Sequence, residues 1–341
     1  GTNSSGTTYG TYKSFTTLVA APAFTISPIA ETVTVNTSIT GYTISSTGGA
    51  VASYALSSTP SGLTFETSTG LLSGSPSTVA AATSYTITAT NANTTATRTF
   101  TLTVVKASRT LTIDSGSYTS TYSRFATLPT LTSTASAGTG TKNYTSSTTG
   151  VCTVNLTSGL VSFVSVGTCR ITASIATDAT YLAATSAEIN FAIALASRTL
   201  SIDASSYTST YTMIATPPTL TSTPSAGTST GKSYASSTSG VCTVNSSTGL
   251  VAFVSIGTCT LSAAITADSN YSSTDSTSIS FAVTKASQSI TFPSMGSMVV
   301  GETISVTVSA TSGLTVTLTP TDLTKCTISG LVVTAVAAGQ C

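Results

Sequence analysis

Six cysteines are the residues whose type and spacing most clearly permit chemistry. They form three pairs separated by 17, 17 and 15 positions: Cys152 and Cys169, Cys242 and Cys259, Cys326 and Cys341. Each second cysteine lies on the apolar face of an alternating segment, and so do the first cysteines of the two earlier pairs. Recurrence in pairs predicts three intramolecular disulfides, with six buried free thiols as the alternative. Oxidised pairs imply a compartment outside the cytosol.

Metal-binding and catalytic constellations are missing from the sequence. The chain has no His and no Cys-x-x-Cys spacing, which argues against zinc and against the usual general base. Two acids recur at matching positions, Asp114 with Asp203 and Asp178 with Asp268. Recurrence once per repeat favours turn or strand-end roles over a paired-carboxylate active site. We therefore expect no enzyme, no catalytic or metal-binding residues and no cofactor.

Tyrosines also recur at matching positions and could stack on sugars. More commonly such rings cover the edge of a core and keep the hydroxyl in contact with solvent. The recurring pairs are Tyr118 and Tyr207, Tyr122 and Tyr211, Tyr144 and Tyr234, and Tyr181 and Tyr271.

Seven Asn-x-Ser/Thr sequons are candidate glycosylation sites, although a chain so rich in hydroxyl residues also generates sequons by chance. They begin at Asn3, Asn36, Asn93, Asn143, Asn155, Asn245 and Asn270. Few Lys or Glu residues protect the expected sheet edges from pairing. Glycans, or burial of the edges in a polymer, would supply that protection.

The elements that must position these residues repeat with a period of about ninety residues. The motif Ala-Ser-Arg-Thr-Leu-Thr-Ile-Asp at 107–114 returns as Ala-Ser-Arg-Thr-Leu-Ser-Ile-Asp at 196–203. A further copy starts at 286 with Ala-Ser-Gln and runs to Cys341, part-way through its pattern. A fixed period of this size indicates an array of small domains.

Composition indicates that these domains are folded β structure. About 40% of the residues are Ser or Thr, 40% are hydrophobic and only 6% are charged. The apolar residues alternate with hydroxyl residues, as in strands that have one buried face and one uncharged, solvent-exposed face. The net charge of +1 provides no basic stripe for nucleic acid. No apolar stretch approaches the length of a membrane span.

Two family resemblances follow from particular motifs. The segments Gly-Val-Cys-Thr-Val-Asn at 240–245, Gly-Thr-Cys-Thr-Leu-Ser-Ala at 257–263 and Asp-Ser-Asn-Tyr at 268–271 resemble bacterial immunoglobulin-like (Ig-like) surface repeats. The segments Pro-Ser-Gly-Leu-Thr-Phe at 60–65 and Thr-Gly-Leu-Leu-Ser-Gly-Ser-Pro at 69–76 are similar to "putative Ig", cadherin-like repeats. We assign the first resemblance to residues 107–341 and the second to residues 20–105.

The repeats and resemblances together imply an all-β chain of tandem Ig-like sandwiches in an elongated array. We expect closing strands of a preceding Ig-like domain at 1–19, a cadherin-like domain at 20–106, repeats at 107–195 and 196–285, and an incomplete repeat at 286–341. The expectation for 1–19 rests on Phe-Thr-Thr-Leu-Val at 15–19, which parallels Phe-Thr-Leu-Thr-Val at 100–104.

For function, the resemblances imply a structural segment of an extracellular stalk, fibre or filament. One alternative is an adhesive or carbohydrate-binding module, including a phage fibre, and another is an accessory region of a larger secreted enzyme. We expect self-association or contact with neighbouring domains of a longer chain, surface glycans as alternative partners, and no nucleic acid or membrane span. The expected location is extracellular or at a cell surface, with a virion surface as an alternative.

Overall fold

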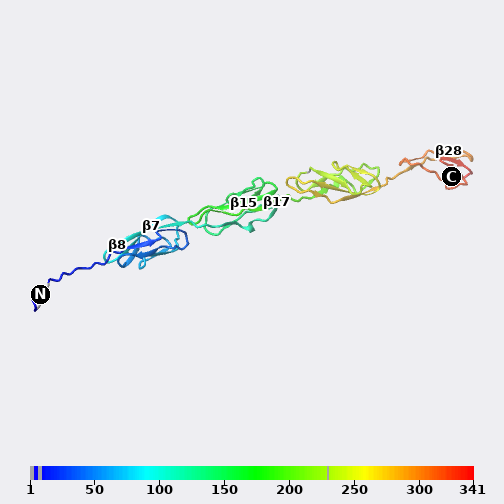
Figure 1. Ribbon diagram of the computed structural model, residues 1–341. Helices are drawn as coiled ribbons and strands as arrows, with labels where there is room; N and C mark the ends of the chain where they lie inside the picture. The colour runs from blue at the N-terminus through cyan, green and yellow to red at the C-terminus, as the bar shows by residue number, and fades with distance from the viewer. Residues whose placement is uncertain (1–3, 7–9, 229) are drawn as a thin grey trace. The chain divides into compact units, whose positions relative to one another are not determined.

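The computed structural model describes residues 4–6, 10–228 and 230–341. These residues form strands almost throughout, with two short 3-10 helices, η1 (Ser115–Ser117) and η2 (Ala204–Ser206). The strands build four successive β-sandwiches, each around its own core, which Figure 1 shows from blue to red along the chain. The chain divides at Ala196 into two compact units with two sandwiches each. The expected all-β fold is confirmed.

The first sandwich is built from eight strands. They are β1 (Phe24–Ser27), β2 (Ala30–Thr34), β3 (Thr43–Ser46), β4 (Ser53–Leu56), β5 (Leu63–Glu66), β6 (Leu71–Gly74), β7 (Ala80–Thr90) and β8 (Thr95–Val105). The main sheet has the order β2-β8-β7-β4, with β2 parallel to β8 and the other pairs antiparallel. The pairs β1-β3 and β5-β6 complete the sandwich.

The second and third sandwiches share one topology. The second contains β9 (Leu111–Ile113), β10 (Thr121–Ser123), β11 (Ser133–Ala135), β12 (Lys142–Ser146), β13 (Cys152–Val154), β14 (Val161–Phe163), β15 (Gly167–Ile175), β16 (Ala184–Thr185) and β17 (Ile189–Ala194). Its main sheet has the order β10-β17-β15-β12, and β16 pairs with β15. The pairs β9-β11 and β13-β14 are separate.

The third sandwich repeats this arrangement strand for strand. Its strands are β18 (Leu200–Ile202), β19 (Thr210–Thr212), β20 (Ser222–Pro224), β21 (Lys232–Ser236), β22 (Cys242–Val244), β23 (Val251–Phe253), β24 (Gly257–Ile265), β25 (Thr274–Asp275) and β26 (Ile279–Thr284). Its main sheet has the order β19-β26-β24-β21. The ninety-residue period in the sequence therefore corresponds to one repeated sandwich.

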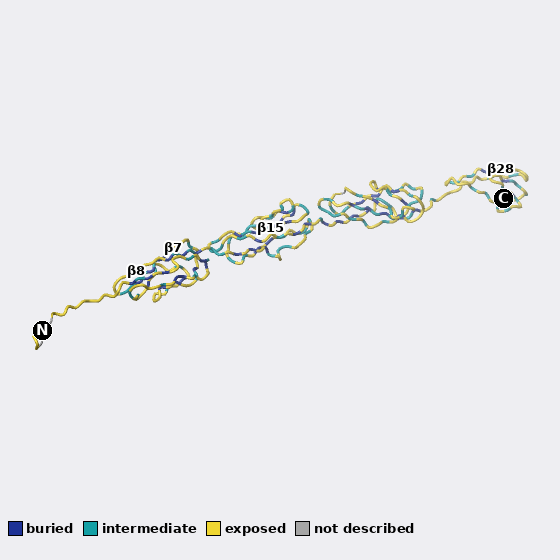
Figure 2. The backbone as a smooth tube through the Cα atoms, in the orientation of Figure 1, coloured by how far each residue is buried: buried dark blue, intermediate teal, exposed yellow. Residues whose placement is uncertain are grey.

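Alternation along the strands produces the cores. On β15, Cys169, Ile171 and Ala173 are buried while the residues between them face outward, because successive side chains point to opposite sides of a strand. The closing strands β17 and β26 add the fully buried rings of Phe191 and Phe281. In Figure 2 buried stretches of the backbone alternate with exposed ones in the first three sandwiches.

The fourth sandwich is smaller. It contains β27 (Ile290–Thr291), β28 (Thr303–Ser305), β29 (Ser309–Ala310), β30 (Cys326–Ser329) and β31 (Val332–Ala335). Its sheets are β28-β31-β30 and β27-β29. The buried core consists of Val306, Cys326 and Val333. This core provides far less apolar burial than those of the other sandwiches.

The segment before the first sandwich forms no strand among its described residues. Phe15 and Leu18 are 86% and 76% exposed, although the sequence predicts a closing strand here. A strand needs a neighbour to satisfy its backbone groups. No strand pairs with residues 10–19, where the Val19 carbonyl accepts one side-chain hydrogen bond, from Asn93 (3.1 Å). The proposed domain boundaries, including 1–19 as part of a preceding domain, stay predictions.

Candidate functional site

A buried arginine is the most elaborate polar site of the second sandwich. The side chain of Arg109 has no exposed surface, and its Nη1 lies 2.8 Å from Oδ2 of Asp178. Arg109 also donates hydrogen bonds to the carbonyl oxygens of Leu182 (2.9 Å), Ala137 (3.2 Å) and Ala176. A buried guanidinium is stable only when it is paired and fully hydrogen-bonded, and these contacts meet that requirement.

Asp178 organises the turn that faces Arg109. Its Oδ1 accepts hydrogen bonds from the backbone N–H groups of Thr180 (2.9 Å) and Tyr181 (2.7 Å), and its Oδ2 accepts one from Thr139 (3.1 Å). The pKa of this carboxyl is lowered to about 2, mainly by the hydrogen bonds from the Tyr181 and Thr180 N–H groups. The Thr139 N–H group and the charge of Arg109 contribute less. Asp178 therefore stays ionised at any ordinary pH.

The third sandwich contains the same constellation. Arg198 is equally buried, its Nη1 lies 3.0 Å from Oδ2 of Asp268, and its guanidinium carbon lies 5.8 Å from the centre of the Tyr271 ring. The corresponding distance from Arg109 to the Tyr181 ring is also 5.8 Å. We call Arg109, Asp178 and Tyr181, and their counterparts in the third sandwich, the arginine clusters.

Each arginine cluster needs a glycine beside it. Gly138 has φ +79°, and a Cβ added there would lie 2.3 Å from Oδ2 of Asp178 and 2.5 Å from Nη1 of Arg109. Gly227 has φ +82° and is crowded by the equivalent groups of the third sandwich. Both the left-handed backbone and the lack of space require glycine here.

The predicted cysteine pairs are joined in the structure. Cys152–Cys169, Cys242–Cys259 and Cys326–Cys341 are disulfides with Cα–Cα distances of 5.5, 5.6 and 5.7 Å. The first two pairs are wholly buried, and each ties the short β13-β14 or β22-β23 hairpin to the main sheet. The pairs therefore connect layers of one sandwich.

The recurring tyrosines pack mainly against the cores. The rings of Tyr122 and Phe191 have centroids 5.2 Å apart, and those of Tyr211 and Phe281 are 5.0 Å apart. Tyr144 and Tyr234 are buried, and each hydroxyl is hydrogen-bonded to a serine hydroxyl of the opposite layer, Ser133 or Ser222. Stacking on sugars would require exposed ring faces.

The recurring acids Asp114 and Asp203 lie where strands end. Oδ2 of Asp114 accepts a hydrogen bond of 2.6 Å from the Thr132 hydroxyl, and Asp203 accepts one of the same length from Thr221. The Thr132 and Thr134 hydroxyls lower the pKa of Asp114. Among the residues that the structure describes, no three His, Cys, Asp or Glu side chains gather as metal ligands do.

The sequons differ in setting. Asn3 lies outside the described residues. Asn36 and Asn93 are exposed, and Asn143 and Asn270 are half-buried. Asn155 and Asn245 are exposed. The side-chain carbonyl of each accepts hydrogen bonds from the backbone N–H groups two and three residues further along the chain. Glycosylation at these sites stays a prediction.

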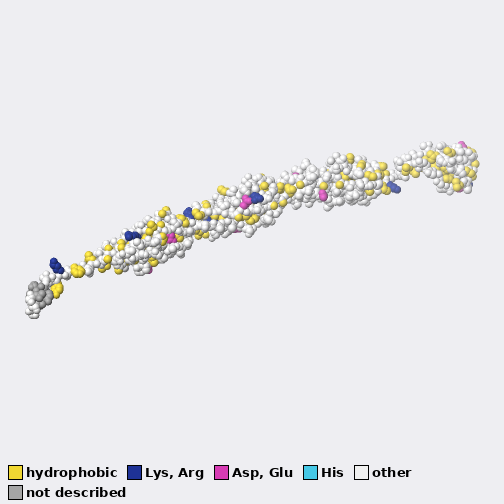
Figure 3. Space-filling view, viewed as in Figure 1, with side chains coloured by type: hydrophobic (Ala, Val, Ile, Leu, Met, Phe, Trp, Pro, Cys, Tyr) yellow, Lys and Arg dark blue, Asp and Glu magenta, His cyan; other side chains and the backbone are white. Residues whose placement is uncertain are grey.

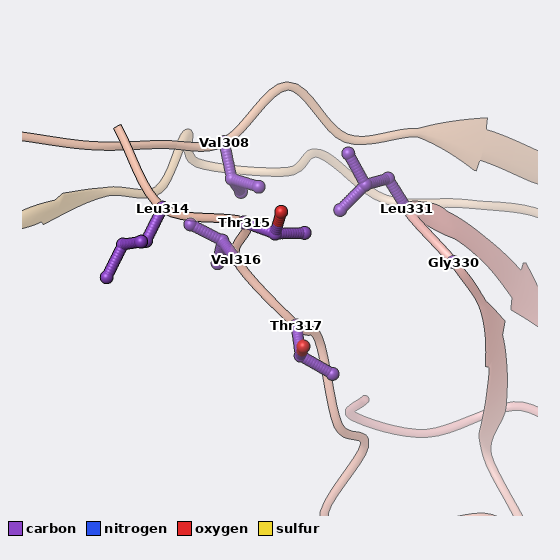
Figure 4. A pocket seen from close by; sticks show the side chains of 7 residues that line it. All are labelled: Val308, Leu314, Thr315, Val316, Thr317, Gly330 and Leu331. Carbon is purple, nitrogen blue, oxygen red and sulfur yellow. The ribbon is translucent and has the colours of Figure 1, made fainter. Parts of the chain in front are cut away.

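An open pocket lies in the fourth sandwich. Figure 4 shows Val308, Leu314, Val316 and Leu331 around it, with two threonine hydroxyls. None of the lining side chains titrates or carries charge. The pocket is thus a gap beside a sparse core, without the convergent polar groups that position a small ligand.

The sequence did not predict the role of the arginines in these clusters. Arg109 and Arg198 belong to the repeated motif Ala-Ser-Arg, and the sequence predicts turn or strand-end roles for Asp178 and Asp268 without linking them to an arginine. The third copy of the motif has Gln288 in place of the arginine, and Gln288 is exposed in the structure. The same sandwich has no arginine cluster among its described residues.

The sheet order, the two-layer cores and the internal disulfides define a class, that of tandem Ig-like β-sandwich domains. Residues 15–105 match the family model named "Putative Ig domain", which confirms the resemblance found for residues 20–105 and starts it five residues earlier. Domains of this class are typically not enzymes. A search of curated proteins found no match.

Solved structures with similar folds include cadherin repeats and a bacterial surface protein. The protocadherin GammaB4 extracellular domain is 13% identical, with 94% of this chain and 62% of that one covered and a TM-score of 0.36. Mouse protocadherin-24 EC1-3 is 12% identical, with 81% and 100% covered and a TM-score of 0.32. A SusE-like surface-located polysaccharide-binding protein from Bacteroides thetaiotaomicron is 17% identical, with 51% and 34% covered and a TM-score of 0.23. These are similarities of fold alone.

Proposed function

We propose that this chain is a structural segment of an extracellular stalk, fibre or filament. The observation that carries the proposal is the joint between the first and second sandwiches. The Val105 carbonyl accepts a hydrogen bond of 2.9 Å from Val35 in the first sandwich, and the Ala107 N–H donates one of 2.9 Å to Thr180 in the second. Lys106 alone separates these two anchored residues. A joint this short leaves few torsions about which the chain could bend.

The side chain of Lys106 strengthens the attachment to the second sandwich. Its Nζ donates hydrogen bonds to the Thr177 hydroxyl (2.9 Å) and to the Asp178 carbonyl. The Leu182 N–H also donates to the Ala107 carbonyl at 2.9 Å. These contacts fall on the turn that Asp178 and Arg109 organise. The arginine cluster therefore supports the joint as well as the fold of its own sandwich.

The remaining features fit the same role. Disulfides stabilise a folded domain because they restrict the conformations of the unfolded chain. This stabilisation benefits a protein that is exposed outside the cell. The described part of the chain has no helix long and apolar enough to cross a membrane. The Phe15–Val19 segment, with its closing-strand pattern and exposed side chains, is suited to pair with a further domain, either a neighbour in a longer chain or a second copy.

The carbohydrate-binding alternative has less support. It rests on loop-tip tyrosines, and the rings of Tyr118, Tyr122, Tyr207 and Tyr211 pack against Phe191 or Phe281. Negative-stain imaging tests the proposal directly. Rods or filaments with a repeat along the axis are expected, whereas dispersed compact particles would favour a binding or accessory module.

A further inference from the structure

The chain enters the second sandwich through residues 107–109, which we call the entry segment. This segment lies against residues 176–182, which follow β15 and which we call the anchoring turn. The Ala107 N–H donates a hydrogen bond to the Thr180 carbonyl, and the Ala107 carbonyl accepts one from the Leu182 N–H, both at 2.9 Å. The entering chain is therefore bound to the sandwich at the first residue that belongs to it.

Arg109 adds charged ties between the entry segment and the anchoring turn. Its Nη1 lies 2.8 Å from Oδ2 of Asp178. Its Nε donates a hydrogen bond to the Leu182 carbonyl at 2.9 Å, and its Nη2 donates one to the Ala176 carbonyl. Hydrogen bonds from a charged donor are stronger than those between neutral groups. One side chain thus fastens the entry segment to both ends of the anchoring turn.

The chain leaves the second sandwich at the other end of the main sheet. Its last strand, β17, lies between β10, to which it is parallel, and β15, to which it is antiparallel. The first residue of β15, Gly167, pairs with Ile193 close to the exit, whereas the last residue, Ile175, leads into the anchoring turn. Tension applied to the chain on both sides of this sandwich therefore acts along the strands.

Tension in this direction loads the contacts at the entry and the exit first. Hydrogen bonds between neighbouring strands run across the strand direction, so a strand that is pulled past its neighbours must break several bonds at once. At the entry, Ala107 must leave the anchoring turn before any later strand is loaded. The rate of unfolding governs how long a domain survives under force. The contacts of the entry segment therefore contribute directly to that survival.

The same tie recurs in the neighbouring sandwiches. In the third sandwich, Arg198 makes the equivalent hydrogen bonds to residues 266–272, which follow β24. In the first sandwich, the neutral side-chain amide of Asn91, between β7 and β8, donates to the Ala20 carbonyl at 2.8 Å. Three sandwiches thus fasten the entering chain to the corresponding turn, and two of them use a buried arginine.

Equilibrium stability alone does not require a buried arginine at this position. Well-packed apolar residues in place of a buried ion pair often leave stability unchanged or increase it. Cations are also scarce, since the chain has only 11 Lys and Arg residues, and Figure 3 shows few of them on the visible surface. What a guanidinium supplies is several directional hydrogen bonds from one rigid group. Such bonds suit a contact that must resist displacement.

We propose that Arg109 and Arg198 are load-bearing clamps, which hold the entering chain of their sandwiches against tension along the chain. The inference rests on the proposed function, because tension is what a stalk or filament transmits. The disulfides limit what happens after a clamp fails. The Cys152–Cys169 bond keeps a 17-residue separation closed, so the second sandwich releases only part of its length when it unfolds.

Stretching of single full-length chains at constant force, with a peptide tag at each end, tests the proposal. Reduction should lengthen the unfolding steps of the second and third sandwiches by about 60 Å, the reach of 17 extended residues. The step of the first sandwich should not change, because residues 20–106 contain no cysteine. The step lengths therefore identify the two sandwiches that carry an arginine clamp.

Arg109→Met should raise the rate of one of these two steps about tenfold at a given force, as for a barrier lowered by about 1.4 kcal/mol. Val161→Ala is the matched control, because Val161 is fully buried on β14, which pairs with β13 and lies outside the entry segment and β17. It should lose thermal stability without a comparable rise in the rate under force. Rates under force that follow the thermal loss equally in both variants would overturn the proposal.

Arg109→Lys tests the clamp if Arg109→Met does not fold. Lysine keeps the positive charge but lacks the fork of donors, so the rate under force should rise by less. An unchanged rate in every folded Arg109 variant would overturn the clamp. Rods in negative stain together with that result would retain the proposed stalk. Compact particles whose rate under force depends on Arg109 would instead support the clamp and contradict the stalk.

Discussion

Arg109 and Asp178, 69 positions apart in the sequence, form an ion pair with 2.8 Å between Nη1 and Oδ2, in which the arginine side chain is buried and the aspartate is 17% exposed. Replacing Arg109 with Met would remove the donor to three backbone carbonyls, while Asp178 would keep its backbone N–H partners. We expect the second sandwich to lose about 1 to 3 kcal/mol of stability, the cost of leaving a buried acceptor without its donor. Hydrogen exchange of the β15 amides measures this loss. The β24 amides of the third sandwich provide the internal control, and Arg198→Met should reverse the pattern.

Acid should weaken the second sandwich in a defined range. Because the folded pKa of Asp178 is about 2, below its ordinary 3.8, the carboxylate contributes stability that is fully present above about pH 4. That contribution is lost as the pH falls through the folded pKa, so unfolding should become easier between about pH 4 and pH 2. Thermal melts of the natural chain and Asp178→Asn test this expectation. An equally steep acid dependence in both proteins would contradict it.

Gly138 should tolerate no side chain. Alanine there must adopt a positive φ and would place its Cβ within 2.3 Å of the Asp178 carboxylate. We expect Gly138→Ala to destabilise the second sandwich by about 1 to 3 kcal/mol. Gly116 is a matched control because a Cβ at that position meets nothing within 4 Å. If Gly138→Ala and Gly116→Ala melt alike, the crowded cluster is not required for stability.

Each disulfide should be intramolecular and confined to one sandwich. Mass spectrometry of unreduced peptides should find the three pairs that the structure joins, with no free thiols. Reduction should destabilise each sandwich by about 3 kcal/mol, the value expected for loops of 15 to 17 residues in the chain-entropy model. Links between different sandwiches would rule out this arrangement.

The strands and cores could be predicted from sequence because alternation depends on local pattern. Cys169, Ile171 and Ala173 alternate with polar residues, and this pattern alone identifies the buried face. The pairing of Arg109 with Asp178 could not be predicted in the same way. The sequence alone predicts that an arginine in a repeated motif is exposed, because arginine is rarely buried. Only the fold brings the two residues together across the sandwich.

The register of β7 against β8 could not be predicted from the sequence either. Alternating threonine at 86–90 and 95–103 indicates two strands, but it does not establish their register. The structure places Thr88 opposite Thr97. Composition alone accounts for such threonines as β-formers.

Small-angle scattering of the full chain, beside a variant with Gly-Gly-Ser inserted between Val105 and Lys106, tests the central claim most directly. If the chain is the proposed rod of four sandwiches, it should reach about 150 Å, at about 3.3 Å per residue along strands of about seven residues plus loops. The insertion should broaden the distribution of distances and shorten its mean. A radius of gyration near 20 Å, the value for one compact domain of this length, would contradict the account. Identical curves for the two proteins would show that the joint contributes no stiffness.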